Sequence, residues 1–112
     1  MPCVAWSVFP SPLIIADAGI NLLAKKSNQG LVIPENTQIF VRFRQGGEEF
    51  FWHGQTKRLK KLFQEWGVSP WLRERVPLIY FNDTLAAIVG YAMSDLFFSK
   101  ESANAWVFVN NY

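Results

Sequence analysis

Cysteine and histidine are almost absent from this sequence of 112 residues, which contains one of each, Cys3 and His53. A single cysteine excludes a disulfide within the chain and any zinc or iron–sulfur site that takes several thiolates from this chain alone. It also fits a reducing compartment. Because fifty residues and several expected turns separate Cys3 from His53, a catalytic dyad between them is not favoured. His53 is interpreted as the end of a hairpin.

The common catalytic and cofactor-binding motifs are missing as well. The sequence contains no HExxH, GxSxG, GxxxxGK(S/T), CxxC or GxGxxG pattern, which excludes metal, nucleophile and phosphate-binding sites of those kinds. The acidic residues are scattered over turns and expected strand ends, so no pair stands out as a general acid and base. We therefore expect no catalytic residue, no metal site and no cofactor in this chain.

Long hydrophobic runs are also lacking. The longest stretch without charge, Met1 to Ala16, is interrupted by prolines and serines, whereas a membrane-spanning helix needs about 20 apolar residues. The first lysine is Lys25, so the basic start of a secretory signal is not seen. We expect no membrane segment and a cytoplasmic location.

Aromatic residues, in contrast, are abundant: ten Phe, five Trp and three Tyr, in a chain that is 50% hydrophobic and 18% charged. This composition excludes a disordered chain and predicts one globular domain over residues 1–112 with a substantial core. Glycine, proline, asparagine and aspartate recur about every eight to twelve residues, which is typical of many short strands. An all-β or α+β fold is therefore favoured.

The clearest strand covers residues 38–44. Its alternation places three apolar side chains on a core face and the arginines Arg42 and Arg44 on the opposite, cationic face. Gln45-Gly-Gly47 then predicts a tight hairpin, whose returning strand is 48–53. Weaker strands are expected over 4–8, 13–15, 20–24 and 31–33.

One amphipathic helix is expected over residues 57–66, with Thr56 as its N-cap and Gly67 past its end. Its apolar positions follow helical spacing and are Leu59, Leu62, Phe63 and Trp66. Its opposite face carries Lys57, Lys60 and Lys61. A short helical turn over 70–75 follows, with Pro70 at its first position.

Two continuous apolar runs, 78–81 and 85–89, flank Asn82-Asp83 and predict a hairpin of central strands that are buried on both faces. Another strand is expected over 91–98, and a final edge strand over 105–109. Together these elements predict a small, sheet-rich α+β domain.

Positive charge is concentrated in one segment. The net charge is only +2, but Thr56 to Arg75 holds six Lys and Arg against two Glu, a net charge of +4, which leaves −2 for the remainder. This segment, which includes Arg58, could face a polyanion, and nucleic acid is the natural candidate. The alternative is an ordinary solvated helix face. Trp71, beside Arg73, could stack on a base or could belong to the core.

Three segments resemble a known family in order and spacing. They are VRFRQGGE at 41–48, LKKLFQE at 59–65 and PWLRERVPLIY at 70–80, and they resemble the C-terminal domain of bacterial tRNA(Ile)-lysidine synthases. The resemblance is strongest from Val41 to Gly90. It implies a β-sandwich of unusual topology, similar to a module in the β-chain of phenylalanyl-tRNA synthetase.

The resemblance also implies a function. The complete enzymes of this family are ATP-dependent carbon–nitrogen ligases, which use ATP with magnesium to attach lysine to the wobble cytidine of the isoleucine tRNA with a CAU anticodon. Their N-terminal catalytic domain carries an SGGxDS loop, and this sequence contains none. The chain would then be the tRNA-binding end, without activity or cofactor of its own, and would grip the acceptor stem. Its partners would be tRNA, the catalytic domain and, in some members, a second copy.

The basic positions in the matching motifs are the candidate tRNA-binding residues, and they coincide with the basic segment. The full candidate set is Arg42, Arg44, Lys57, Arg58, Lys60, Lys61, Arg73 and Arg75. Arg73 has a structural alternative, in which it pairs with a carboxylate of the sheet and holds the helical turn. For the domain as a whole, the alternative is a structural or self-association module without RNA contact.

Overall fold

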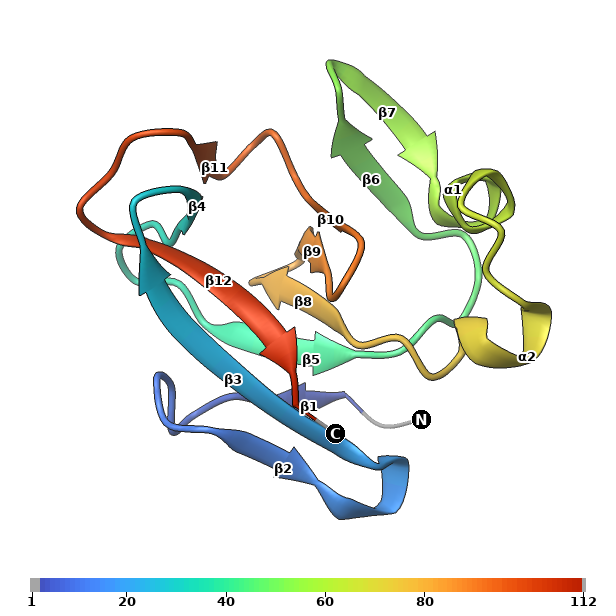
Figure 1. Ribbon diagram of the computed structural model, residues 1–112, viewed down its shortest axis with the longest axis horizontal. Helices are drawn as coiled ribbons and strands as arrows, with labels where there is room; N and C mark the ends of the chain where they lie inside the picture. The colour runs from blue at the N-terminus through green and yellow to red at the C-terminus, as the bar shows by residue number, and fades with distance from the viewer. Residues whose placement is uncertain (1–2, 112) are drawn as a thin grey trace.

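Two antiparallel sheets and a smaller third layer make up the structure, a computed structural model that describes residues 3–111 (Figure 1). Sheet A has the strand order β1-β5-β8-β9-β10, where β1 is Val4–Ala5, β5 Ile39–Arg42, β8 Leu78–Phe81, β9 Thr84–Ile88 and β10 Ala92–Met93. Sheet B has the order β11-β4-β12-β3-β2, where β11 is Phe98–Ser99, β4 Gly30–Val32, β12 Ala105–Asn110, β3 Ile20–Ser27 and β2 Leu13–Ile15. Every strand pair is antiparallel.

The third layer lies on the face of sheet A that is turned away from sheet B. It contains a hairpin and two helices: β6 is Glu49–Trp52, β7 Gln55–Arg58, α1 Leu59–Glu65 and α2 Pro70–Arg73. A short 3-10 helix, Ala16–Ala18, joins β2 to β3. No helix in the described part of the chain, residues 3–111, is long and apolar enough to cross a membrane. The prediction of a small, sheet-rich α+β fold is confirmed.

Sheet A is covered on both faces, and β8 shows this most clearly because all four of its residues are buried. Ile79 and Phe81 belong to the core between the two sheets, whereas Leu78 and Tyr80 belong to the core under the third layer. A β-bulge at Ile79/Tyr80 shifts the register with β9. The predicted hairpin of central, two-sided strands is therefore confirmed.

The core between the sheets is aromatic. Trp6 is almost fully buried, its ring lies edge-on to Phe9 and Phe108, and its indole N–H donates to the Ser11 carbonyl at 2.7 Å. On β5 and at the residue that follows it, the predicted inward face is confirmed, since Ile39, Val41 and Phe43 are all buried in this core.

The core under the third layer is built on α1. Leu59, Leu62 and Phe63 are fully buried, as their helical spacing predicts, and pack with Phe50 of β6 against sheet A. Gly67, with φ +68°, lies just past the helix end. The apolar side of α1 therefore faces sheet A, and its basic side faces outward.

The predicted hairpin between 38–44 and 48–53 is wrong. β5 pairs with β1 and β8, whereas β6 pairs with β7. The two strands do not meet because the Gly46–Gly47 loop leads out of sheet A into the third layer. In that loop, the Glu48 carboxylate accepts hydrogen bonds from the backbone N–H groups of Gln45 and Gly46, at 2.6 and 3.0 Å.

The helix begins two residues later than predicted. Lys57 and Arg58 are the last residues of β7, and Thr56 is a strand residue rather than an N-cap. The first N–H group of α1, that of Leu59, donates to the Glu48 carbonyl at 2.9 Å. Strand pairing with β6 holds the chain extended up to that point. The second helix is also shorter than predicted and covers Pro70–Arg73.

Three further expectations need correction. The first strand is only Val4–Ala5, and the predicted strand 91–98 is divided between β10 of sheet A and β11 of sheet B. The division comes from a turn at Ser94, whose hydroxyl donates to the Phe51 carbonyl at 2.9 Å. The last strand, β12, is the central strand of sheet B and not an edge, because β3 and β4 pair with it on either side.

Gly30 provides a test of the sheet B arrangement. A Cβ atom at this position would lie 2.4 Å from the Trp106 carbonyl oxygen, and φ is +154°. We expect Gly30→Ala to lower the free energy of unfolding by about 1–3 kcal/mol, because β4 and β12 must separate. Urea unfolding measures the loss. Gly47→Ala is the control, since that position also has positive φ but no neighbour within 4 Å; equal losses for both variants would contradict the close approach.

Candidate nucleic-acid interface

The eight candidate basic residues lie in the elements on the third-layer side of sheet A. Arg42 and Arg44 come from the end of β5 and the loop after it, Lys57 and Arg58 from β7, Lys60 and Lys61 from α1, and Arg73 and Arg75 from α2 and the turn after it. We call this set the basic face. The remaining cationic residues of the sequence are Lys25, Lys26 and Lys100. The basic face therefore holds most of the positive charge of the chain.

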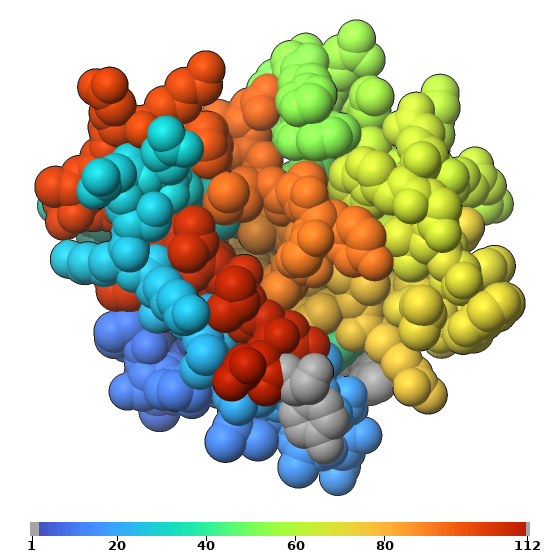
Figure 2. Space-filling model, viewed as in Figure 1, coloured from blue at the N-terminus to red at the C-terminus, as the bar shows by residue number. Residues whose placement is uncertain are grey.

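On α1, burial of the apolar side chains decides where the lysines point. Since Leu59, Leu62 and Phe63 face sheet A, Lys60 and Lys61 are exposed. In Figure 2, α1 and α2 form one continuous surface, yellow-green to yellow, along the right side of the molecule. The expected separation of an apolar and a basic helix face is confirmed.

Lys57 and Arg58 reach this surface from a strand instead of from the helix. The Lys57 ammonium lies 3.9 Å from the Glu65 carboxylate, a half-exposed ion pair of the kind that adds little stability. Arg58 is exposed and lies opposite Glu49 across the hairpin. Among residues 3–111, Arg58, Lys60, Lys61 and Arg75 form no ion pair within 4 Å.

Arg42 is held by aromatic rings. Its guanidinium carbon lies 4.5 Å from the centre of the Tyr80 ring and 5.7 Å from that of Phe40, with 37% of the side chain exposed. Its ion pair with Asp83 is long, 3.9 Å, and Asp83 is fully exposed. Burial raises the pKa of the Tyr80 phenol, the Glu48 carboxylate raises it further, and Arg42 opposes both. Tyr80 is thus a neutral platform for Arg42 at ordinary pH.

Arg73 and Arg75 have different surroundings although they are two residues apart. The Arg73 Nε–H donates to the Val68 carbonyl at 2.9 Å, which ties α2 to the segment before it. The alternative of a carboxylate partner for Arg73 is wrong among the described residues, but its stabilising role is supported. Arg75 is exposed, as is Trp71, with 75% of its surface accessible. Trp71 is therefore not a core residue.

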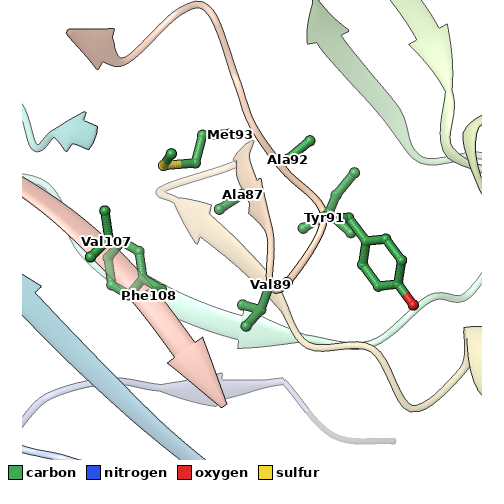
Figure 3. Close-up of a pocket in the computed structure, with 9 residues that line it drawn as sticks. Ala87, Val89, Tyr91, Ala92, Met93, Val107 and Phe108 are labelled. Atoms are coloured by element: carbon green, nitrogen blue, oxygen red, sulfur yellow. The ribbon is translucent and has the colours of Figure 1, made fainter. Parts of the chain in front are cut away.

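Residues 3–111 contain no group of three or more His, Cys, Asp or Glu residues that could hold a metal ion. The cleft in Figure 3 lies between β12 and the β9–β10 corner, and its only polar side-chain group is the hydroxyl of Tyr91. The loop amides of Gln45 and Gly46 already bind the Glu48 carboxylate, so they are not free for a phosphate.

One feature of this surface is not predicted by the sequence: an aromatic cluster beside the basic face. The His53 ring stacks on Trp52 with 3.7 Å between centroids, Trp52 meets Trp66 edge-on at 5.5 Å, and Trp66 stacks on Tyr91 at 5.4 Å. His53 lies at the end of a hairpin, but in the turn between β6 and β7 and not, as predicted, at the end of a strand that pairs with 38–44. Only the ring contacts in the tertiary structure reveal the cluster, and no sequence pattern signals it.

Comparison with known proteins agrees with this geometry. The family model described as "TilS substrate C-terminal domain" matches residues 39–110. The chain belongs to this family. The tRNA(Ile)-lysidine synthase of Legionella pneumophila (strain Lens) is 59% identical over 108 residues, which cover 96% of this chain. That of Coxiella burnetii (strain RSA 493 / Nine Mile phase I) is 41% identical over 94% of this chain. The resemblance seen in the three motifs is therefore confirmed.

The family also has this fold. A crystal structure of the TilS C-terminal domain superposes with a TM-score of 0.70 at 20% identity and covers 92% of each chain. The chain spans about a quarter of the length of the Legionella relative and 24% of the Coxiella relative. Membership in the family thus concerns this domain, and the named synthases contain much more sequence.

The contact between Arg42 and Tyr80 can be measured by a double-mutant cycle. We expect Arg42→Ala and Tyr80→Leu to show a coupling free energy of about 0.5–1 kcal/mol in urea unfolding, as for a partly exposed cation–π pair. Tyr80→Phe is the control, since it keeps the ring and should keep most of the coupling. Additive effects of Arg42→Ala and Tyr80→Leu would show that the two side chains do not interact.

Proposed function

We propose that this chain is the tRNA-binding domain of a tRNA(Ile)-lysidine synthase and that its basic face holds the acceptor stem. The observation that carries the proposal is a set of four exposed cationic side chains on one side of sheet A that form no ion pair within residues 3–111: Arg58, Lys60, Lys61 and Arg75. Double-stranded RNA is recognised mostly through its shape and its phosphates. A rigid sheet with a basic helix suits such recognition.

The packing of the basic face supports this role. α1 is fixed to sheet A by three fully buried side chains, and the hydrogen bond from Arg73 ties α2 to the Val68 carbonyl in the segment before it. The lysines of α1 therefore start from a fixed backbone, so only their side chains must be ordered when a phosphate binds. Arg42, resting on Tyr80, extends the same surface towards the end of β5.

We assign the ligase reaction to another part of the synthase. The described residues contain no candidate metal cluster, and the sequence lacks an SGGxDS loop. ATP with magnesium would bind the catalytic domain, and residues 1–112 would form one domain that presents the tRNA in the cytoplasm. In this proposal the chain contributes affinity for tRNA and no chemical step.

Binding to RNA tests the proposal. We expect the purified chain to bind the CAU isoleucine tRNA and an acceptor-stem minihelix with comparable affinity, and binding to weaken steeply with salt, because each phosphate contact contributes about 0.7–0.9 to the slope of log K against log salt. Lys60→Ala with Lys61→Ala should weaken binding and reduce that slope by about 1 per lysine. Fluorescence anisotropy at low and moderate salt measures both.

The matched control is Lys25→Ala with Lys26→Ala, which removes the same charge from exposed positions of sheet B. If both double variants weaken binding equally, the net charge and not the basic face is responsible. If the chain binds no RNA even at low salt, the proposal is wrong for this domain.

A self-association module is the second candidate, and one observation favours it. The cleft of Figure 3 continues into a hollow of about 410 Å³, whose rim exposes Leu72, Tyr91 and Val109. Exposed apolar surface of this kind often marks a protein contact. A second copy of this chain is the occupant to test.

We expect Leu72→Lys to leave the stability of the monomer nearly unchanged, because Leu72 is exposed. If the chain forms a dimer through this hollow, sedimentation at increasing concentration will show a dimer that the variant abolishes. A monomer at every concentration excludes this second candidate and leaves the RNA proposal intact.

A further inference from the structure

A second hollow opens at the tip of the β6–β7 hairpin, outside the basic face. Its volume is about 390 Å³, and its wall consists of Trp52, His53, Met93, Asp95, Phe98 and Lys100. Figure 1 shows the turn of this hairpin across from the loop that joins β10 to β11. The wall thus combines flat rings, a carboxylate and an ammonium group.

The rings at this hollow are held in place. His53 occupies the left-handed region, with φ +53°, so its ring folds back on Trp52 at an interplanar angle of 22°. Trp52 is braced from another side by the edge-on ring of Trp66. A planar ligand would meet a preformed aromatic surface, which lowers the entropy lost on binding.

The opposite wall is tied to the hairpin by hydrogen bonds. The Gly54 N–H donates to Asp95 Oδ2 at 2.8 Å, the Asp95 N–H donates to the Phe51 carbonyl at 3.1 Å, and the Ser94 hydroxyl donates to the same carbonyl at 2.9 Å. Asp95 Oδ1 has no such bond among the described residues. It can therefore accept a hydrogen bond from an N–H group of a ligand.

The hollow and the basic face are connected through β7. This strand runs from Gln55 beside the turn to Lys57 and Arg58, which belong to the basic face. Four strand residues span only about 10–13 Å. Lys100, exposed at the hollow, would continue the line of positive charge. An RNA strand that leaves the basic face along β7 reaches the aromatic rings within a few nucleotides.

We propose that the hairpin-tip hollow receives the base of an unpaired nucleotide of the RNA that the basic face binds. The base stacks on the Trp52–His53 pair, an N–H group of the base donates to Asp95, and the adjoining phosphate contacts Lys100. Stacking on aromatic side chains is tolerant of sequence and is typical of single-stranded nucleic acid binding. This inference rests on the proposed function, since it names a second contact of the same ligand.

Two RNAs distinguish binding at the hollow from binding at the basic face: a blunt hairpin, and the same hairpin with a short unpaired 3′ tail. We expect the tail to tighten binding by about tenfold. His53→Asn and Lys100→Ala should each remove a large part of that gain without changing affinity for the blunt hairpin. Asparagine tolerates the positive φ of position 53, so the first variant keeps the turn. Lys25→Ala is the matched control for charge and should leave the gain unchanged.

A photocrosslink locates the tail directly. With 4-thiouridine in the tail, we expect the crosslinked peptide to contain Trp52 and His53. Equal binding of the blunt and tailed hairpins, a gain that both variants leave intact, or a crosslink elsewhere would overturn the hollow as a nucleotide site while the basic face stands. Failure of both RNAs to bind would overturn the proposed function and this inference together.

Discussion

The structure depends on burial of sheet A on both faces. Its central strand β8 buries alternate side chains in two different cores, Ile79 and Phe81 towards sheet B and Leu78 and Tyr80 towards the third layer. A four-residue strand without a polar position is stable only when both of its faces are covered. The second sheet and the helical layer therefore both depend on this strand.

The location of the basic face follows from the same constraint. α1 must turn its apolar side chains inward to complete the second core, and this places Lys60 and Lys61 outside. At the end of β5, the third layer does not fully cover Arg42, which lies partly exposed on the Tyr80 ring. The charged surface is thus a by-product of how the third layer is packed, and its orientation is fixed by the core beneath it.

Predictions from the sequence succeeded where a local pattern has one physical meaning. Helical spacing identified α1, and two continuous apolar runs around Asn82-Asp83 identified the β8–β9 hairpin. They failed where the pairing partner of a strand had to be predicted. Adjacency along the chain favoured a hairpin between 38–44 and 48–53, but β5 pairs with β1 and β8. The candidate basic residues could be named in advance, because charge is visible in sequence, whereas the aromatic hollow could not.

The sequence by itself determined the class of fold, the apolar faces of α1 and β5, the family and the concentration of positive charge. These properties are set by the order and spacing of residue types. Only the tertiary structure decided which strands pair, that Arg73 binds the Val68 carbonyl, and that Trp52, His53 and Asp95 meet at one hollow. The strand pairs among these contacts join residues as distant along the chain as Leu22 and Asn110, and their free energy depends on packing that no local pattern specifies.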